Sequence, residues 1–269
     1  MKIKTSDTDI RRIIMTGIGL TSLSSISWYV VGGASFTVIV PVATCIILFV
    51  IINNHRDNSK ERDIIFEQIE SILGLYWAVR PTELLPGTRG WAASPDFLRL
   101  VSSSIINDEP SLVLELGSGV STVISGYAIQ KVNNGSIVSL DHIEKYANKT
   151  EKHIVKHELK EKCSVILAPM SEYDICGEKW MWYENSKIKD KKEIDMVIVD
   201  GPPSHNQSLA RYPALPILRE KLSGNAKILV DDADRQDTKL MVDKWKKDFS
   251  IQCEYVDTEK GAYILRFRS

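Results

Sequence analysis

Short apolar segments that end in Gly or Asp alternate with polar stretches of helical periodicity from Pro110 to the end of the chain. Such β-then-α units, of which we count five, predict a doubly wound parallel α/β sheet that binds ligands at the carboxyl ends of its strands. The link from Asp257 to Lys260 is too short for a right-handed crossover, so the last two strands are predicted to form an antiparallel hairpin. The strands are predicted in seven segments: SLVLELG, SIVSLD, SVILAP, DMVIVDG, AKILVDD, IQCEYVD and AYILRFR.

A run of 40 residues from Ile13 to Ile52 contains no Asp, Glu, Lys, Arg or His. A membrane span needs about 20 apolar residues, so this run predicts two transmembrane helices, at about 13–31 and 34–52. Basic residues flank the run on both sides, and the positive-inside tendency then places both ends in the cytoplasm. We therefore predict a multi-pass protein of the inner (plasma) membrane that contacts the lipid bilayer through residues 13–52 and keeps its catalytic domain in the cytoplasm.

Two alternatives to a membrane hairpin are a cleaved signal peptide and a buried soluble hairpin. The apolar core of a signal peptide is much shorter, and a soluble hairpin without charges would need protein on every side. The chain has 34 basic and 35 acidic side chains, so a nucleic-acid partner is not expected. The predicted organisation is an anchor in residues 1–55, a connecting amphipathic helix and lid segment in 56–105, and a catalytic domain in 106–269.

The connecting segment has apolar residues at helical spacing from Ile64 to Tyr76, which predicts an amphipathic helix of about 20 residues. Packing on the following domain is favoured over a position on the bilayer surface. The segment from Pro81 to Leu100 is rich in Pro and Gly, and we interpret it as a lid that leads into a helix capped by Ser94 or Asp96.

The first predicted strand of the domain ends in ELGSGVST, residues 115–122. Two glycines let the backbone approach a ligand at a helix N-terminus, although a tight turn without a ligand also fits. The NAD fingerprint would need a third glycine in place of Thr122, and Glu115 would repel a pyrophosphate and attract a cation. The second strand ends in Asp141, whose carboxylate can accept both hydroxyls of a ribose.

At these residues the sequence resembles the class I S-adenosylmethionine-dependent methyltransferases, over about Ser111 to Ser269. The resemblance implies a Rossmann-like sheet of seven strands with an antiparallel last strand, and S-adenosyl-L-methionine as the cofactor. It implies that Glu115 faces the methionine ammonium through the glycine turn, that Asp141 holds the ribose and that His142 lies near the adenine. The cofactor-binding residues implied in this way are Glu115, Gly117, Ser118, Gly119, Ser121, Thr122, Asp141, His142, Met170 and Asp200.

The third strand departs from the pattern of this family. It ends in Ala168-Pro169-Met170 and lacks the acidic residue that many members place near the adenine amino group. We expect the backbone or the packing of Met170 to take that role.

Acidic residues also end the fourth and fifth strands, at Asp200 and at Asp231 with Asp232. Hard oxygen ligands of this kind suit Mg²⁺. The pattern is similar to the metal-dependent O-methyltransferases, including catechol-type and macrolide-sugar enzymes, and it implies that Asp200, Asp231 and Asp232 are metal ligands. Asp200 and His205 are the candidate catalytic residues, with His205 as general base. Alternatively, Asp200 faces solvent or orients the donor, the other two aspartates cap the next helix, and His205 is a loop residue.

Two further segments bear on the substrate. ARYPALPIL, residues 210–218, resembles the segment after the DGPP motif in a bacterial subgroup like methyltransferase family 24, so Arg211 either contacts substrate or is structural. Trp180, Trp182 and Tyr183 are predicted in a loop before the fourth strand, where they stack on a sugar or ring or cover the sheet edge.

These observations favour a membrane-anchored methyltransferase that methylates a hydroxyl on a glycan, a lipid-linked or a small-molecule acceptor. The alternative is a non-catalytic, membrane-anchored binding or assembly module. A nucleotide-dependent oxidoreductase is disfavoured by Glu115 and Thr122. The acceptor, the metal requirement and the oligomeric state stay open at this stage.

Overall fold

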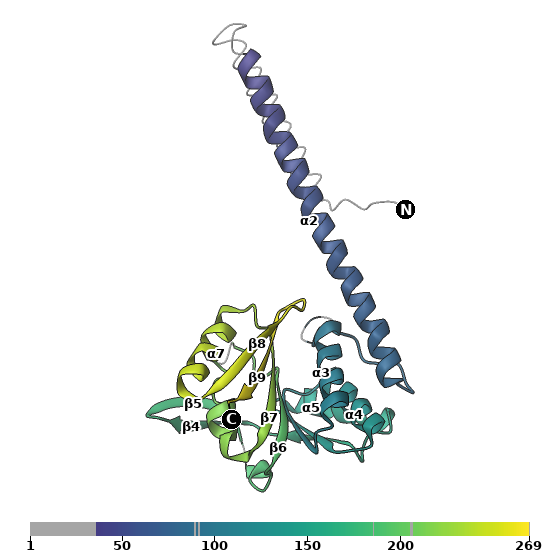
Figure 1. Cartoon of the computed structure of the whole chain (residues 1–269), viewed down its shortest axis with the longest axis vertical. Coiled ribbons are helices and arrows are strands. Elements are labelled where there is room, and N and C mark those ends of the chain that lie inside the picture. Colours follow the sequence, from purple (N-terminus) through teal and green to yellow (C-terminus); the bar gives the residue numbers. More distant parts are fainter. Residues whose placement is uncertain (1–35, 89, 91, 185, 205–206, 269) are drawn as a thin grey trace. The chain divides into compact units, whose positions relative to one another are not determined.

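The computed structural model describes residues 36–268 apart from 89, 91, 185, 205 and 206. It divides the chain into two compact units, Met1–Ile64 and Ile65–Ser269. Helix α2 (Phe36–Val79) contributes to both units (Figure 1). Everything that bears on the site lies in the second unit.

The predicted membrane spans are not found among the described residues. No helix in the described part of the chain is both long enough and apolar enough to cross a bilayer. The first predicted span, 13–31, lies outside the described residues. The second, 34–52, overlaps α2, which the structure describes from Phe36 and which continues without a break beyond Ile52 through polar and charged residues to Val79. The predicted multi-pass location in the inner membrane is therefore wrong.

The second unit is built on a seven-stranded sheet of order β3-β2-β1-β6-β7-β9-β8 (Figure 1). The strands are β1 (Leu112–Leu116), β2 (Ser136–Asp141), β3 (Cys163–Leu167), β6 (Ile194–Val199), β7 (Leu222–Asp231), β8 (Ile251–Val256) and β9 (Ala262–Phe267). The first five strands of that order are parallel, and β9 runs antiparallel to both β7 and β8. The prediction of a doubly wound α/β sheet with an antiparallel last strand is confirmed.

Helices cover both faces of this sheet, because side chains that alternate along a strand point to opposite sides. On β1, Val113 packs with the cluster formed by the end of α2, α3 (Pro95–Asp108), α4 (Val120–Val132) and α5 (Glu144–Lys156). Leu114 and Leu116 pack on the other face, with α6 (Ala214–Leu218) and α7 (Gln236–Asp248). The strands are thus buried on both sides, as a parallel sheet requires.

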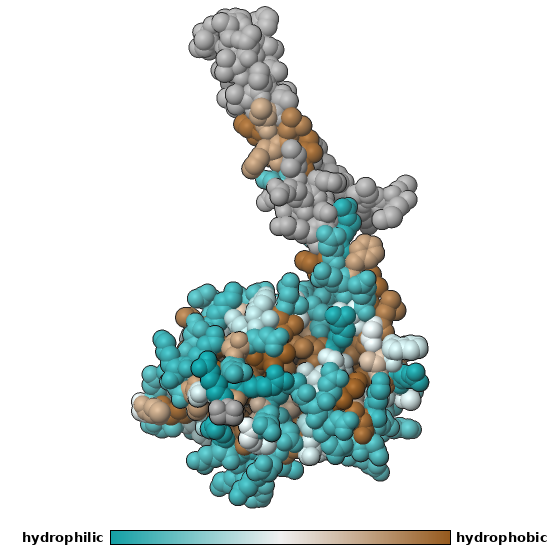
Figure 2. All heavy atoms as spheres, viewed as in Figure 1, coloured by the Kyte–Doolittle hydropathy of each residue, from teal (hydrophilic) through white to brown (hydrophobic). Residues whose placement is uncertain are grey.

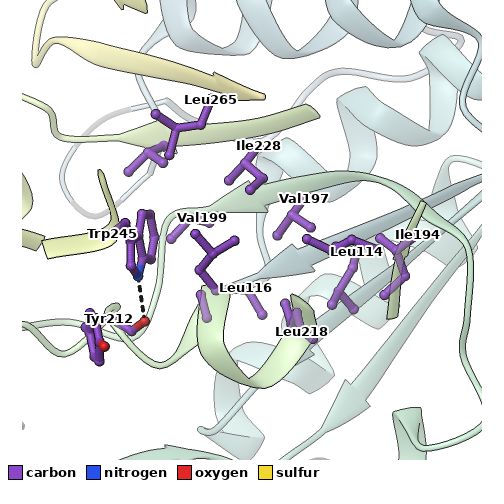
Figure 3. Packing of buried hydrophobic residues seen from close by; sticks show 14 of the residues in the cluster. Leu114, Leu116, Ile194, Val197, Val199, Tyr212, Leu218, Ile228, Trp245 and Leu265 are labelled. Atoms are coloured by element: carbon purple, nitrogen blue, oxygen red, sulfur yellow. Dashed lines mark hydrogen bonds between the residues drawn. The ribbon is translucent and has the colours of Figure 1, made fainter. Parts of the chain in front are cut away.

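The core beneath α7 is centred on Trp245, which is fully buried (Figure 3). Its indole Nε1 donates a hydrogen bond of 2.8 Å to the carbonyl oxygen of Tyr212. Val199 and Leu116 from the sheet belong to the same cluster. This packing anchors the segment after β6, which carries residues of the site described below.

A second, two-stranded sheet replaces the predicted loop before the fourth strand of the main sheet. It pairs β4 (Met170–Ile175) with β5 (Glu178–Tyr183) in antiparallel register. Cys176 and Gly177 form its two-residue turn with φ of 55° and 82°, and a type I′ hairpin turn needs positive φ at both positions. Trp182 and Tyr183 are therefore buried strand residues and do not belong to a loop. The short helices η2 (Ser186–Ile188) and η3 (Arg219–Lys221) complete the fold.

The second half of α2 packs on the domain through Leu75 and Val79, which are buried in the cluster with α3 and α4. Gln68 donates from Nε2 to Asp96 Oδ2 at 2.8 Å and so joins α2 to the first turn of α3. Helix α3 begins directly after Ser94, which occupies the N-cap position, but the Ser94 side chain makes no capping hydrogen bond. The visible face of this unit is largely hydrophilic (Figure 2).

Helix α4 approaches the sheet closely at Gly126. A Cβ added there would lie 2.2 Å from Cys163 Sγ and 3.1 Å from a methyl carbon of Leu159. Gly126→Ala is therefore expected to lower the free energy of unfolding by about 1–3 kcal/mol, because a well-packed core does not absorb an extra carbon without strain. Urea unfolding measures this loss, and Gly126→Ala combined with Cys163→Ala is expected to recover part of it. Equal stability of Gly126→Ala and wild type would contradict the packing.

Candidate functional site

The glycine turn after β1 lies against the end of β6. Gly117 has φ of +95°, a conformation that favours glycine, and its N–H bonds to Leu140 O at 2.9 Å. The N–H of Gly201 bonds to Leu116 O at 2.6 Å, and a Cβ on Gly117 would lie 3.2 Å from Gly201 N. The backbone after β1, at Gly117, thus packs directly on the backbone after β6, at Gly201. Gly119 differs, because a Cβ added there would meet open space.

Glu115 lies on β1 just before this turn and is fully buried. Its Oε2 accepts hydrogen bonds from Thr122 Oγ1 at 2.5 Å and from the hydroxyl of Ser139. Thr122 Oγ1 in turn accepts the N–H of Gly119 at 3.1 Å. Burial raises the pKa of Glu115 to about 7, against the opposing effect of these hydroxyl donors. The carboxyl group therefore supports the turn from the protein side.

The raised pKa of Glu115 predicts a pH dependence of stability. Between the ordinary value of 4.5 and about 7, the folded protein holds a proton that the unfolded chain has released. The free energy of unfolding is therefore expected to fall as the pH rises through this window, by up to about 1.4 kcal/mol per pH unit. Urea unfolding at several pH values measures the slope. Glu115→Gln should reduce the slope, part of which remains because the pKa of Asp231 is also raised. Parallel slopes for the two proteins would contradict the assignment.

Asp141 ends β2 beside the same turn and is nearly buried. Its Oδ2 accepts from Ser118 Oγ at 2.7 Å and from Ser118 N at 3.3 Å, and its Oδ1 accepts from Ile143 N at 3.0 Å. The ring of His142 lies 5.9 Å from that of Tyr183, edge to face. Met170, at the start of β4, pairs with Tyr183 across the hairpin. The structure thus brings His142 and Met170 to one side of the glycine turn, together with Asp141.

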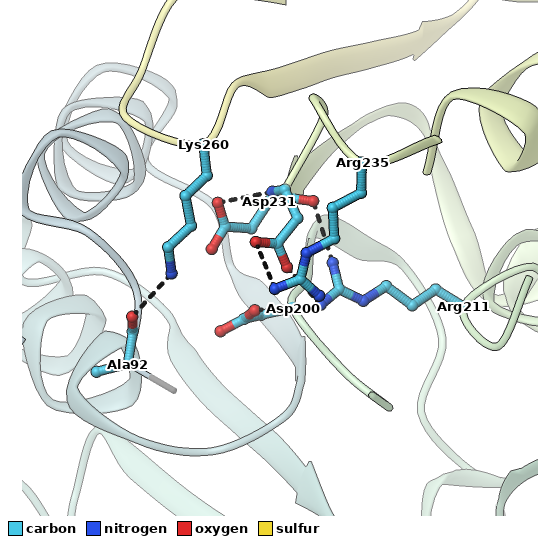
Figure 4. Close-up of polar contacts among 7 residues, drawn as sticks. Ala92, Asp200, Arg211, Asp231, Arg235 and Lys260 are labelled. Carbon is cyan, nitrogen blue, oxygen red and sulfur yellow. Dashed lines mark hydrogen bonds and ion pairs between the residues drawn. The ribbon is translucent and has the colours of Figure 1, made fainter. Parts of the chain in front are cut away.

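Three carboxylates meet at the ends of β6 and β7 (Figure 4). One oxygen from each of Asp200, Asp231 and Asp232 lies within 4.8 Å of the others. Asp231 Oδ1 accepts the N–H of Asp232 at 2.8 Å, and Asp231 Oδ2 is buried without a hydrogen-bond partner among the described residues. Burial, and then the carboxylates of Asp200 and Asp232, raise the pKa of Asp231 to about 8.

Arginine side chains enter this cluster (Figure 4). Arg211 lies after β6 and is 8% exposed. Its Nη2 donates to Asp232 Oδ2 at 2.8 Å and lies 3.5 Å from Asp200 Oδ1, while its Nη1 donates to the carbonyl oxygen of Asp231 at 3.1 Å. Arg235 Nη2 lies 3.1 Å from the other oxygen of Asp232. Burial alone would lower the pKa of Arg211, but the carboxylates of Asp200 and Asp232 outweigh burial and raise it.

Lys260 adds a third positive charge on the opposite side of the carboxylates. Its Nζ bonds to the carbonyl oxygen of Ala92 at 3.2 Å (Figure 4). The charge of Lys260 opposes the rise in pKa of both Asp200 and Asp231. The cluster therefore contains three acidic and three basic side chains.

Comparisons with known proteins agree with this arrangement. A family model described as a methyltransferase domain matches residues 114–233. The chain carries a methyltransferase domain. The match runs from Leu114, within β1, to the residue after the carboxylate pair, so the matched segment includes the side chains of the site described above except those of Arg235 and Lys260. No curated protein matches the chain.

Solved structures share the fold of the methyltransferase domain at low sequence identity. The SAH-bound methyltransferase PaMTH1 of Podospora anserina is 16% identical, with a TM-score of 0.54 over 74% of this chain and 88% of that one. An O-methyltransferase from Bacillus cereus in complex with SAH is 13% identical, with a TM-score of 0.51 over 75% and 91%. TomG, an O-methyltransferase from Streptomyces achromogenes, is 13% identical, with a TM-score of 0.50 over 74% and 90%.

The methyltransferase domain places the predicted residues in two groups. The turn, the first turn of α4 and the end of β2 bring together Glu115, Gly117, Ser118, Gly119, Ser121, Thr122 and Asp141. The second group, Asp200, Asp231 and Asp232, lies at the ends of β6 and β7. His205, the candidate base, lies outside the described residues.

Sequence reasoning missed two parts of the site. It treated Arg211 as a substrate contact or a structural residue, whereas the structure shows it between the carboxylates. It placed Tyr183 in a loop, whereas β5 holds this side chain over Gly201. The alternation of apolar residues along 178–183, next to the turn-forming Gly177, is the signal that would have indicated the strand.

Proposed function

We propose that the chain is an S-adenosylmethionine-dependent methyltransferase that methylates a hydroxyl of a small-molecule or glycan acceptor. The observation that carries the proposal is the glycine turn with Asp141 at its edge. The turn leaves open space at Gly119, where nothing in the protein itself requires a glycine. A carboxylate beside that space suits the ribose hydroxyls of a nucleoside. The residues present therefore fit this donor.

The donor, when bound, supplies an electrophilic methyl group on a sulfonium. Gly117 and Gly119 would let the backbone lie close under it, and Asp141 would accept its ribose hydroxyls. Glu115 acts indirectly, because its hydrogen bonds to Thr122 and Ser139 fix the turn. Much of the rate enhancement would come from alignment of donor and acceptor and from fixed charges around them.

Asp200 is the proposed base for the acceptor hydroxyl. It is partly exposed at the end of β6, with 21% of its side chain accessible, and its Oδ1 lies 3.5 Å from Arg211. Burial raises the pKa of Asp200. A raised pKa suits a general base, because such a base works best when its pKa lies near the operating pH. His205 stays a prediction as a second candidate for this role.

The carboxylate cluster does not fit the predicted Mg²⁺. Both oxygens of Asp232 face arginine side chains, and one oxygen of Asp231 accepts a backbone N–H. A divalent ion that joined Asp200 to Asp232 would displace the Arg211 guanidinium, which already supplies positive charge there. We derive no step through a metal ion and assign the compensation of these charges to Arg211.

Methyl transfer is therefore expected to be independent of divalent cations. Dialysis against EDTA, followed by addition of Mg²⁺ or Mn²⁺, should change the initial rate less than twofold, because Arg211 provides the positive charge within the protein. The rate is measured as transfer of labelled methyl to phenolic and sugar acceptors. A loss of more than tenfold that Mg²⁺ restores would contradict this assignment.

The proposed function itself is tested by titration of the purified chain with S-adenosylmethionine and S-adenosylhomocysteine in a calorimeter. We expect binding of both, at micromolar concentrations typical of enzyme ligands. Transfer to an acceptor should fall strongly in Asp200→Asn while donor binding persists. Failure of both compounds to bind at millimolar concentration would refute the proposal.

A further inference from the structure

The hydroxyl of Tyr183 lies where β1 and β6 end. A Cβ placed on Gly201 would be 2.4 Å from Tyr183 Oη, and the same point is 3.2 Å from Gly117 Cα. The phenol oxygen therefore rests over the two glycines whose backbones pack on each other. This is the base of the site that we assign to the donor.

Tyr183 is held in place by its neighbours. Strand β5 pairs it with Met170, and Tyr173 Oη donates to its carbonyl oxygen at 3.1 Å. The indole ring of Trp182 lies 5.1 Å from its ring, edge to face, and His142 lies on the same ring at 5.9 Å. A ring fixed in this way keeps its hydroxyl at one point.

That hydroxyl is buried and has no hydrogen-bond partner among the described residues. The whole residue is 1% exposed. A buried hydroxyl without a partner is unfavourable, and native proteins leave few such groups. A polar atom of a bound molecule would supply the partner that the described residues do not provide.

The charges around Tyr183 keep the phenol neutral. Burial raises its pKa well above the ordinary value, and the nearby carboxylates of Asp141, Asp200 and Glu115 raise it further against the opposing charge of Arg211. The O–H is thus intact at neutral pH and can donate.

We propose that Tyr183 is a donor-binding residue whose hydroxyl forms a hydrogen bond with a polar atom of the nucleoside sulfonium donor above the glycine turn. This inference rests on the proposed function. It assigns to the β4–β5 hairpin a direct part in donor recognition, in addition to the loop after β1 and the carboxylate of Asp141.

The test compares Tyr183→Phe with wild type in two measurements. Removal of the hydroxyl is expected to weaken binding of S-adenosylmethionine and S-adenosylhomocysteine about three- to tenfold, the effect of one hydrogen bond. Urea unfolding without ligand should show equal or greater stability, because an unpartnered buried hydroxyl is removed. Tyr127→Phe is the matched control: its hydroxyl has partners in His157 and Thr82, so its loss should reduce stability and leave donor affinity unchanged.

A second variant tests the same contact from the glycine side. Gly201→Ala would force the hydroxyl away, since the new Cβ falls 2.4 Å from it. We expect Gly201→Ala to weaken donor binding, and the added methyl group to be tolerated better in the Tyr183→Phe background than in wild type.

Three outcomes would overturn the assignment. Affinity of Tyr183→Phe within twofold of wild type means that the hydroxyl does not touch the donor. Tighter binding means that it obstructs the donor, and a clear loss of stability without ligand means that its role is structural. If wild type binds neither compound, the proposed function itself is refuted. If wild type binds and Tyr183→Phe binds equally well, only the assignment of Tyr183 is refuted.

Discussion

Arg211→Ala is expected to lower the free energy of unfolding by about 3–5 kcal/mol, the cost of removing one partner from a buried ion pair. The substitution leaves Asp232 with only the half-exposed Arg235 and leaves Asp200 without its 3.5 Å neighbour. Arg235 and Lys260 then compensate the three carboxylates only in part, and these carboxylates repel one another in a buried setting. Urea unfolding monitored by tryptophan fluorescence measures the change.

Arg235→Ala is the matched control, because its guanidinium contacts the same carboxylate but is 51% exposed. Exposed ion pairs contribute about 0–1 kcal/mol, so its loss should be small. Arg211→Ala with Asp232→Asn should recover part of the stability by removing one negative charge. Arg211→Ala should also bind Mn²⁺ more tightly than wild type does. A loss below 1 kcal/mol with no gain in Mn²⁺ binding would show that Arg211 does not compensate the cluster.

Asp141→Ala is expected to weaken donor binding about 10- to 100-fold. Hydrogen bonds to a charged group contribute about 1.5–3 kcal/mol, and the proposed function assigns to Asp141 the ribose hydroxyls. Calorimetric titration with S-adenosylhomocysteine measures the affinity.

Two controls separate ligand contact from local structure at Asp141. Ser118→Ala removes the hydroxyl on Oδ2 and keeps the carboxylate, so its effect should be much smaller. Asp141→Asn keeps the shape and loses the charge, and we expect an intermediate loss. Equal affinities of Asp141→Ala and wild type would remove Asp141 from the donor site.

The sheet was predictable because four of its five parallel strands are short apolar segments that end in Gly or Asp, whereas β3 ends before Ala168-Pro169. Gly117, Asp141 and Asp200 close three buried apolar segments, and parallel strands place such ends at one edge. Residues that act from outside these strand ends were harder to identify. Arg211 reaches Asp231 and Asp232 from a segment about 20 positions earlier, and nothing in local periodicity indicates a tertiary ion pair of that kind.

The charge-free run, residues 13–52, led to a prediction that was wrong. Lack of charge over 40 residues predicted two spans, yet the described part of the run is one segment of a helix that continues through Asn53 to Val79. Absence of charge is a property of composition, whereas a span also requires a sufficient length of strongly apolar helix. The apolar residues spaced along 64–76 lie in α2 as the predicted helix requires, but Ile65, Ile69 and Leu73 are exposed, and α2 packs on the domain through Leu75 and Val79 instead.

The β4–β5 hairpin forms its own ladder of hydrogen bonds and shares no strand pairing with the main sheet. One end of it, at Tyr183, reaches the glycine turn, and the other end is the exposed tip at Cys176 and Gly177. Changes in length or composition at the tip therefore leave the pairing of the seven strands untouched. In evolution or by design, the tip can therefore change while the end at Tyr183 and the residues at the edge of the main sheet are inherited unchanged.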